Sequence, residues 1–354
     1  MANLVDTLKQ FIRTRYAGML DRLELRASEY GALNLFKKQS NGPMSILTDE
    51  IKQQIQESFG NTIQIPVLNF EDITISVTRT CEVQTGGADS ALVTLVFFTA
   101  AFGFPMVPSR HLANNISYQG YYARNFDARR LKLLEFLDGK CVDWLDLKKN
   151  TFFPAGMTAY YPVSGGALQV SLANSKEFFN SVPSIMATAD FGGRPDVLTN
   201  PMGMMYVRAL DAQGEENAVN SSYQIASVGE FFQSNRVLNG TGVKSTEYLV
   251  GDASVAIESR VDPDCRQGRT IGGDVEPSKM WTTMDVPGIG TMGYYFRADC
   301  SDQSTLLAAE RMGYGKRVYV ESHEWSADFV LMINHNSSPS TRYGSIIKAE
   351  LLTT

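Results

Sequence analysis

The residues that most resemble a ligand-binding motif are glycines late in the chain. The segment Gly288–Gly293 has the spacing GxGxxG, which in dinucleotide-binding proteins joins a strand to the amino end of a helix. Here Pro287 precedes the motif, and the residues after it, Tyr294–Arg297, have the composition of a strand. The spacing therefore predicts a glycine-rich turn that leads into a strand. A second segment, Gly240–Ser245, lacks the spacing of a phosphate-binding loop and predicts a plain loop.

Side chains that bind metals or transfer protons are few and scattered. Glu324 follows His323, but no second histidine lies four residues later, so the pair does not form a zinc-binding helix motif. A core or surface position is the better interpretation of His323. Four acids near one another have no ligand-loop spacing and are interpreted as solvated turn residues: Asp252, Glu258, Asp262 and Asp264. The sequence thus predicts no catalytic, cofactor-binding or metal-binding residue, and no cofactor.

Composition excludes some classes of protein. The chain has 354 residues with a net charge of −6, which gives no basic surface for a dedicated nucleic-acid reader. No hydrophobic leader is visible at the amino end, and the four cysteines are far apart, as expected for reduced thiols: Cys81, Cys141, Cys265 and Cys300. The uncharged run Ala91–Pro108 approaches the length of a membrane span, but its glycine, prolines and β-branched residues predict a buried strand.

The first hundred residues change from a helical to a strand period. Apolar residues recur at helical spacing over residues 1–30, Gly31 breaks that pattern, and a loop follows at residues 40–43. A short helix is predicted from Thr48, ending near Gly60. We expect residues 1–60 to form a helical arm with little core of its own. Alternation then predicts a long β-hairpin, with a strand through Ile73, Ile75 and Val77, a turn at residues 84–89 and a return strand at residues 91–98.

The rest of the chain mixes helices and strands. One long amphipathic helix is predicted over residues 119–149, a shorter one over 176–189 and a helical piece over 228–235. Strands are expected at residues 293–297, 317–321, 329–334 and 345–352. No internal repeat separates these elements, so intertwined subdomains are expected.

The order of these parts resembles the Hong Kong 97-type capsid fold of tailed-bacteriophage major capsid proteins, which encapsulins also use. Individual sequence segments add to the resemblance. The segment Arg194–Pro201, followed by Met204–Leu210, resembles capsid segments in which a strand leads to a short helix. The stretches Gly315–Glu321 and Trp325–Asn336 also look like capsid carboxyl ends. The resemblance implies an α+β fold with an N-terminal arm, an extended hairpin loop, a long spine helix in a peripheral domain, and an axial domain.

The resemblance also implies boundaries and a function. The expected parts are the arm (1–62), the extended loop and start of the peripheral domain (63–118), the spine helix and peripheral domain (119–174), the axial domain (175–286) and a return to the peripheral domain (287–354). It implies a non-enzymatic structural subunit that assembles into pentamers and hexamers of an icosahedral head around double-stranded DNA. The virion, after assembly in the host cytoplasm, is its implied location.

The implied partners are other copies of the chain, with scaffold, portal and decoration proteins. Packaged DNA would be contacted weakly and without sequence specificity, and no membrane is involved. Two alternatives stay open: an encapsulin-like compartment shell, and a nucleotide-binding α/β enzyme that uses Gly288–Gly293. An arm and a two-stranded ribbon bury little alone, so they invite a partner surface. The predicted assembly contacts are therefore Leu4, Leu8, Phe11, Ile12, Ile73, Ile75, Val77, Gly86, Gly87 and Asp89.

Overall fold

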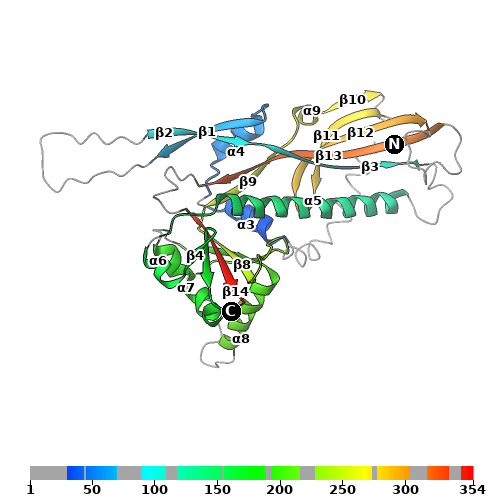
Figure 1. The fold of residues 1–354 in the computed structure, drawn as a ribbon. Coiled ribbons are helices and arrows are strands. Elements are labelled where there is room, and N and C mark those ends of the chain that lie inside the picture. Colours follow the sequence, from blue (N-terminus) through cyan, green and yellow to red (C-terminus); the bar gives the residue numbers. More distant parts are fainter. Residues whose placement is uncertain are drawn as a thin grey trace, which may run out of the picture.

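The fold is α+β, as predicted, and is built around two six-stranded sheets (Figure 1). The structure is a computed structural model. It describes residues 30–43, 45–69, 89–108, 118–153, 155–188, 191, 193–215, 228–272, 277–302, 317–334 and 344–353.

The first sheet is antiparallel and has the order β10-β11-β12-β13-β3, with β9 beside the end of β13. Its longest strand pairs with β12 on one side and with β3 on the other. The strands are β3 (Phe98–Met106), β9 (Val255–Arg260), β10 (Arg269–Gly272), β11 (Pro277–Val286), β12 (Gly290–Asp302) and β13 (Arg317–Ile333). The predicted strands at 317–321 and 329–334 are thus two ends of one strand.

The long helix α5 (Tyr118–Lys148) covers one face of this sheet, as Figure 1 shows. The prediction of 119–149 is confirmed, because the apolar face of the helix is continuous and meets a continuous apolar sheet face. Trp325 of β13 lies at the centre, with ring centroids 5.0 Å from Phe102 and 5.1 Å from Phe126. On the apolar face of the helix, Trp144 is partly exposed. The other residues of this face are buried: Phe126, Leu133, Leu134, Leu137, Cys141 and Leu145.

The second sheet is mixed and has the order β4-β5-β14-β8-β6-β7. Its parallel pairs are β14 with β5 and β6 with β7. The strands are β4 (Val163–Ser164), β5 (Ala167–Val170), β6 (Asp196–Thr199), β7 (Phe231–Gln233), β8 (Val243–Val250) and β14 (Ile346–Leu352). The helices around it are α6 (Ala155–Tyr160), the 3₁₀ turn η2 (Leu172–Asn174), α7 (Ser175–Thr188) and α8 (Pro201–Glu215).

A two-stranded hairpin extends from the first sheet at the end opposite β10 (Figure 1). It consists of β1 (Thr62–Asn69) and β2 (Asp89–Val96), which pair antiparallel from Thr62 opposite Val96 to Asn69 opposite Asp89. The predicted return strand at residues 91–98 is confirmed for residues 91–96, which belong to β2. The predicted strand through Ile73, Ile75 and Val77 lies outside the described residues.

The helix α4 (Asp49–Glu57) lies beside the base of the hairpin and begins as predicted. The Thr48 hydroxyl accepts a hydrogen bond from the Ile51 backbone N–H at 3.3 Å, which caps the first turn. Its end differs from the prediction, because the cap is Ser58, whose side chain and backbone donate to helix carbonyls, and Gly60 lies beyond it. The short helix α9 (Pro263–Gln267) lies nearby.

A helix that the sequence patterns did not predict, α3 (Gly31–Asn41), begins at Gly31, directly after the non-helical residue Tyr30. A Cβ atom on Gly31 would lie 2.3 Å from the Gln233 carbonyl oxygen, so glycine is required for close contact between two segments. Leu33, Leu35 and Phe36 are fully buried in the main core. Within the expected arm of residues 1–60, α3 therefore packs into the main core of the chain.

Two further expectations differ from the structure. The piece at 228–235 is not helical: it contains β7, which pairs in parallel with β6. The expected boundary between residues 286 and 287 also does not separate the two sheets. The strands β9 to β11 precede it but belong to the first sheet, and β14 follows it but belongs to the second. Tertiary pairing decides both cases, since local sequence does not specify which distant strand a short strand will meet.

Candidate assembly surfaces

The glycine motif forms a turn, as predicted. Gly288 and Gly290 have φ of +80° and +124° between the antiparallel strands β11 and β12. The Gly288 carbonyl accepts a hydrogen bond from Lys37 Nζ at 2.5 Å, and burial lowers the pKa of that amine to about 8. The strand β12 follows the motif, so Gly288–Gly293 lacks the helix whose amino end binds the phosphates in dinucleotide-binding proteins.

His323 is a core residue of β13. Its Nδ1 lies 2.7 Å from the Tyr294 hydroxyl, and aromatic rings surround it. Burial lowers its pKa to about 3, so the imidazole is neutral, and its Nε2 has no hydrogen-bond partner within the described part of the chain. The nearest acid, Glu321, is 4.0 Å from Nε2 but accepts a hydrogen bond from Tyr118. This arrangement is a buried polar contact in an aromatic core.

The acids Asp252, Glu258, Asp262 and Asp264 do not gather into a site. Asp262 caps α9 by accepting a hydrogen bond from the Asp264 backbone N–H at 2.8 Å. Burial raises the pKa of Glu258. Among the residues that the structure describes, no group of three or more histidines, cysteines or acids could hold a metal ion.

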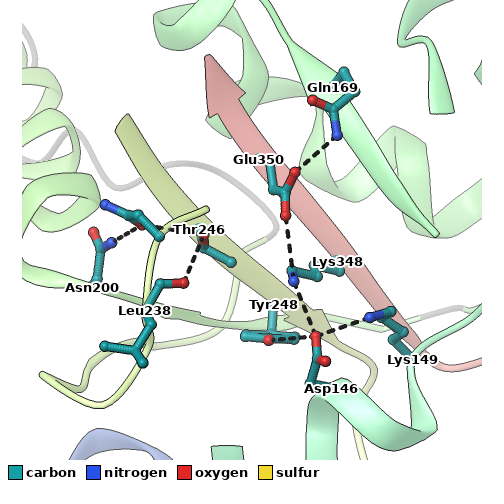
Figure 2. A network of polar contacts seen from close by, with 10 residues as sticks. Asp146, Lys149, Gln169, Asn200, Leu238, Thr246, Tyr248, Lys348 and Glu350 are labelled. Carbon is teal, nitrogen blue, oxygen red and sulfur yellow. Dashed lines mark hydrogen bonds and ion pairs between the residues drawn. The ribbon is translucent and has the colours of Figure 1, made fainter. Parts of the chain in front are cut away.

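A polar network joins α5 to the second sheet (Figure 2). Asp146 near the end of α5 accepts hydrogen bonds at 3.0 Å from Lys149, from Lys348 of β14 and from the Tyr248 hydroxyl of β8. Burial alone would raise the pKa of Asp146, but these hydrogen bonds outweigh it and the pKa is lowered. Lys348 also contacts Glu350 at 3.3 Å. The network fixes the second sheet to the end of the long helix.

The hairpin has one covered face and one uncovered face. Leu95 and Ile65 point toward α4 and the end of the first sheet, where they join Val330 and other residues in a small core. On the opposite face, Leu92 and Val96 are 65% and 64% exposed. Large apolar side chains on a protruding two-stranded ribbon are typical of a surface that a partner covers.

A second apolar surface lies between α5 and the strand β3. This strand pairs with β13 on one side only, and no described strand pairs with its other edge. Along this edge lie two hollows of about 380 Å³ and 210 Å³. The exposed stripe of α5 that borders them includes Phe136 and Leu147. We call this surface the α5–β3 groove.

Most of the predicted assembly residues lie outside the described residues: Leu4, Leu8, Phe11, Ile12, Ile73, Ile75, Val77, Gly86 and Gly87. Asp89 is described and begins β2 opposite Asn69. Leu92, Val96 and the residues of the groove were not among the predicted contacts. A signal existed for the helix, because Phe136 and Leu147 interrupt an otherwise polar face of α5.

Comparison with known proteins finds similarity at the level of structure. No protein-family model matches the chain, and no curated protein matches it. A solved structure of the capsid of Ralstonia phage GP4 is 7% identical, with 85% of this chain and 86% of that chain covered and a TM-score of 0.49. A structure from Mycobacterium phage Che8 is 9% identical, with 87% and 89% covered and a TM-score of 0.46.

The capsid structure of the cyanophage P-SCSP1u is also 9% identical, with 83% of this chain and 84% of that chain covered and a TM-score of 0.45. Two of these three structures are of capsids. No helix in the described part of the chain is long and apolar enough to cross a membrane.

Proposed function

We propose that this chain is a structural protein that assembles into a shell, the major capsid protein of a tailed bacteriophage. The observation that carries the proposal is the hairpin of β1 and β2. It protrudes from the first sheet, and its uncovered face presents Leu92 and Val96. Burying one such side chain stabilises an assembly by about 1.5–3 kcal/mol, so a neighbouring subunit that covers this face forms a more stable contact.

The order of elements supports the same proposal. A hairpin, then one long helix across a sheet, then a second α/β unit is the arrangement that the capsid resemblance implies. We assign the first sheet and α5 to the peripheral domain. We assign the second sheet with α6, α7 and α8 to the axial domain, so this domain takes in β14. The axial domains would meet at the centre of each pentamer or hexamer.

The proposed partners follow from that role. Other copies of the chain come first, and scaffold, portal and decoration proteins are further proposed partners. The net charge of −6 is suited to weak contact with packaged DNA, because a surface that grips DNA needs clustered cations. The proposed location is the virion, with assembly in the host cytoplasm.

Electron microscopy of the purified protein in negative stain, with light scattering on the same sample, tests the proposal. We expect rings of five or six subunits or closed shells, alone or when a scaffold protein from the same genome is co-expressed. A homogeneous monomer or dimer under both conditions would contradict the proposal.

A further inference from the structure

We infer that the α5–β3 groove of one copy binds the α4 surface of a second copy. The inference rests on the proposed function and deepens it by naming two surfaces that meet when subunits assemble. It is carried by the shape, charge and exposure of described residues on both surfaces.

The groove consists of two hollows along the helix. They lie on either side of the contact between Phe98 and Phe136, whose rings meet edge to face with centroids 6.4 Å apart. The exposed side chains bordering it include Leu147, which is 70% exposed, and Phe136, which is 45% exposed. Trp144 also lines the smaller hollow. A partner that brings an apolar side chain would fill this site.

The groove has a positive charge. Its lining includes three cations and one acid, Asp143, which gives a net charge of +2, or +1 when Glu135, which pairs with Lys132 at 2.7 Å, is counted. The cations are Arg129, Lys132 and Lys140.

The surface of α4 has the opposite charge and one prominent apolar side chain. The helix has three acids and one cation, Lys52, which gives a net charge of −2. Two more acids, Asp262 and Asp264, are exposed on α9 nearby. Just after the helix, Phe59 is 78% exposed, with the Arg266 guanidinium 5.8 Å from its ring centre. The acids of α4 are Asp49, Glu50 and Glu57.

The two surfaces lie on opposite faces of the first sheet. On β13, Leu331 lines the smaller hollow on the α5 side, whereas Val330 and Met332 pack in the core that contains Ile55 of α4. Neighbouring residues of a strand point to opposite faces, so α4 is directed away from the groove of its own copy. A contact between two different patches is head-to-tail, and repetition of such a contact produces rings or extended shells.

Charge exchange tests this contact. Lys132→Glu with Lys140→Glu reverses the groove, and Glu50→Lys with Glu57→Lys reverses α4. We expect each double variant to lose assembly, and the chain with all four substitutions to regain it, because its charges are again complementary. Lys279→Glu, at an exposed cation on β11 of the first sheet, is the matched control and should assemble like the unmodified chain. Thermal melting of every variant checks folding, and Glu57→Lys places a cation at a helix carboxyl end, which favours the helix.

The outcomes separate the inference from the proposed function. If the unmodified chain forms shells and both double variants also do, the inference is wrong and the proposed function stands. If folded double variants fail and the fourfold variant also fails, the two surfaces do not meet each other. If the unmodified chain never assembles, the proposed function and the inference fall together.

A second measurement does not depend on charge. A photoreactive benzoylphenylalanine placed at position 136 within assembled particles should cross-link to a peptide that contains residues 49–59 of a neighbouring copy. Mass spectrometry identifies the linked peptide. Links that go exclusively to other segments would overturn the inference even if the charge variants behave as expected.

Discussion

A neutral histidine in the core makes the stability of this protein depend on pH. His323 has a pKa near 3 when folded and an ordinary value of 6.5 when unfolded. The unfolded chain therefore binds more protons below pH 6.5, and stability falls as the pH decreases from there toward 3. Between pH 7 and pH 5 this group should lower the free energy of unfolding by about 2 kcal/mol.

Urea unfolding at the two pH values, on the chain and on His323→Gln, measures this contribution. Glutamine can still accept from the Tyr294 hydroxyl but does not titrate. We expect the variant to lose less stability than the unmodified chain on acidification. Equal losses in both proteins would mean that His323 does not titrate on unfolding in this range.

Glu247 on β8 gives a dependence of the opposite sign. Burial raises its pKa to about 8, while its Oε1 accepts hydrogen bonds from Ser245 at 2.6 Å and Thr199 at 3.3 Å. The folded state binds the extra proton, so this contribution is complete below pH 4.5 and is lost as the pH rises toward 8. Glu247→Gln, which stays neutral, should therefore raise the free energy of unfolding at pH 7 by about 1–3 kcal/mol. The gain should shrink at pH 5 in urea unfolding, and a gain independent of pH would contradict the assignment.

At the scale of elements, the start of α3 depends on one glycine. A Cβ atom at Gly31 would overlap the backbone of Gln233, whereas one at Gly139 in α5 would meet nothing within 4 Å. We expect Gly31→Ala to lower the free energy of unfolding by about 3 kcal/mol or more, because two backbone segments must separate. Gly139→Ala is the matched control and should raise it by about 0.5–1 kcal/mol through helix propensity. Thermal or urea unfolding distinguishes the two, and similar effects at both positions would refute the contact at Gly31.

Helices with a continuous apolar face were predictable, and elements defined by a distant neighbour were not. The prediction for α5 is within one residue of the observed helix at each end, because its period persists over 31 residues. Gly31 has the sequence signal of a helix breaker, and only the nearby Gln233 backbone explains its place in α3. Phe231 and Phe232 carry no local signal that they pair in parallel with Val197 and Leu198.

The candidate surfaces were predictable in kind but not in place. Alternation along the hairpin indicated a ribbon with an apolar face, but which face stays uncovered depends on how α4 and β9 pack against it. The α5–β3 groove combines residues that are far apart in the sequence, and their proximity comes from the position of α5 on the sheet. Sequence patterns describe one element at a time, so a surface shared by two elements has no sequence signature of its own.

At the scale of the molecule, the two sheets share one hydrophobic core, which holds Tyr248 of the second sheet together with Trp325 of the first, and polar contacts of α5 add to this connection. The buried carboxylate of Asp138 in α5 accepts hydrogen bonds from the Leu33 backbone N–H and the Ser234 hydroxyl, which ties α3 and the segment after β7 to the helix. Asp146 ties the same helix to β8 and β14. Because these contacts hold the two sheets in one relative position, the subunit can contact its neighbours at both ends without a change in that position.

Substitutions on the uncovered face of the hairpin should affect assembly without affecting the folding of the subunit. Leu92 and Val96 contribute little to the folded monomer because most of their surface is exposed, so Leu92→Ser with Val96→Ser should change its free energy of unfolding by less than about 1 kcal/mol. The same double variant should fail to form shells, because burial of this face no longer stabilises the contact between subunits. Leu95→Ser, on the covered face, is the matched control and should destabilise the monomer by about 2–4 kcal/mol. Urea unfolding of the subunit and microscopy of the assembled sample measure the two effects separately. Normal shells from the Leu92 and Val96 variant would show that this face has no role in assembly.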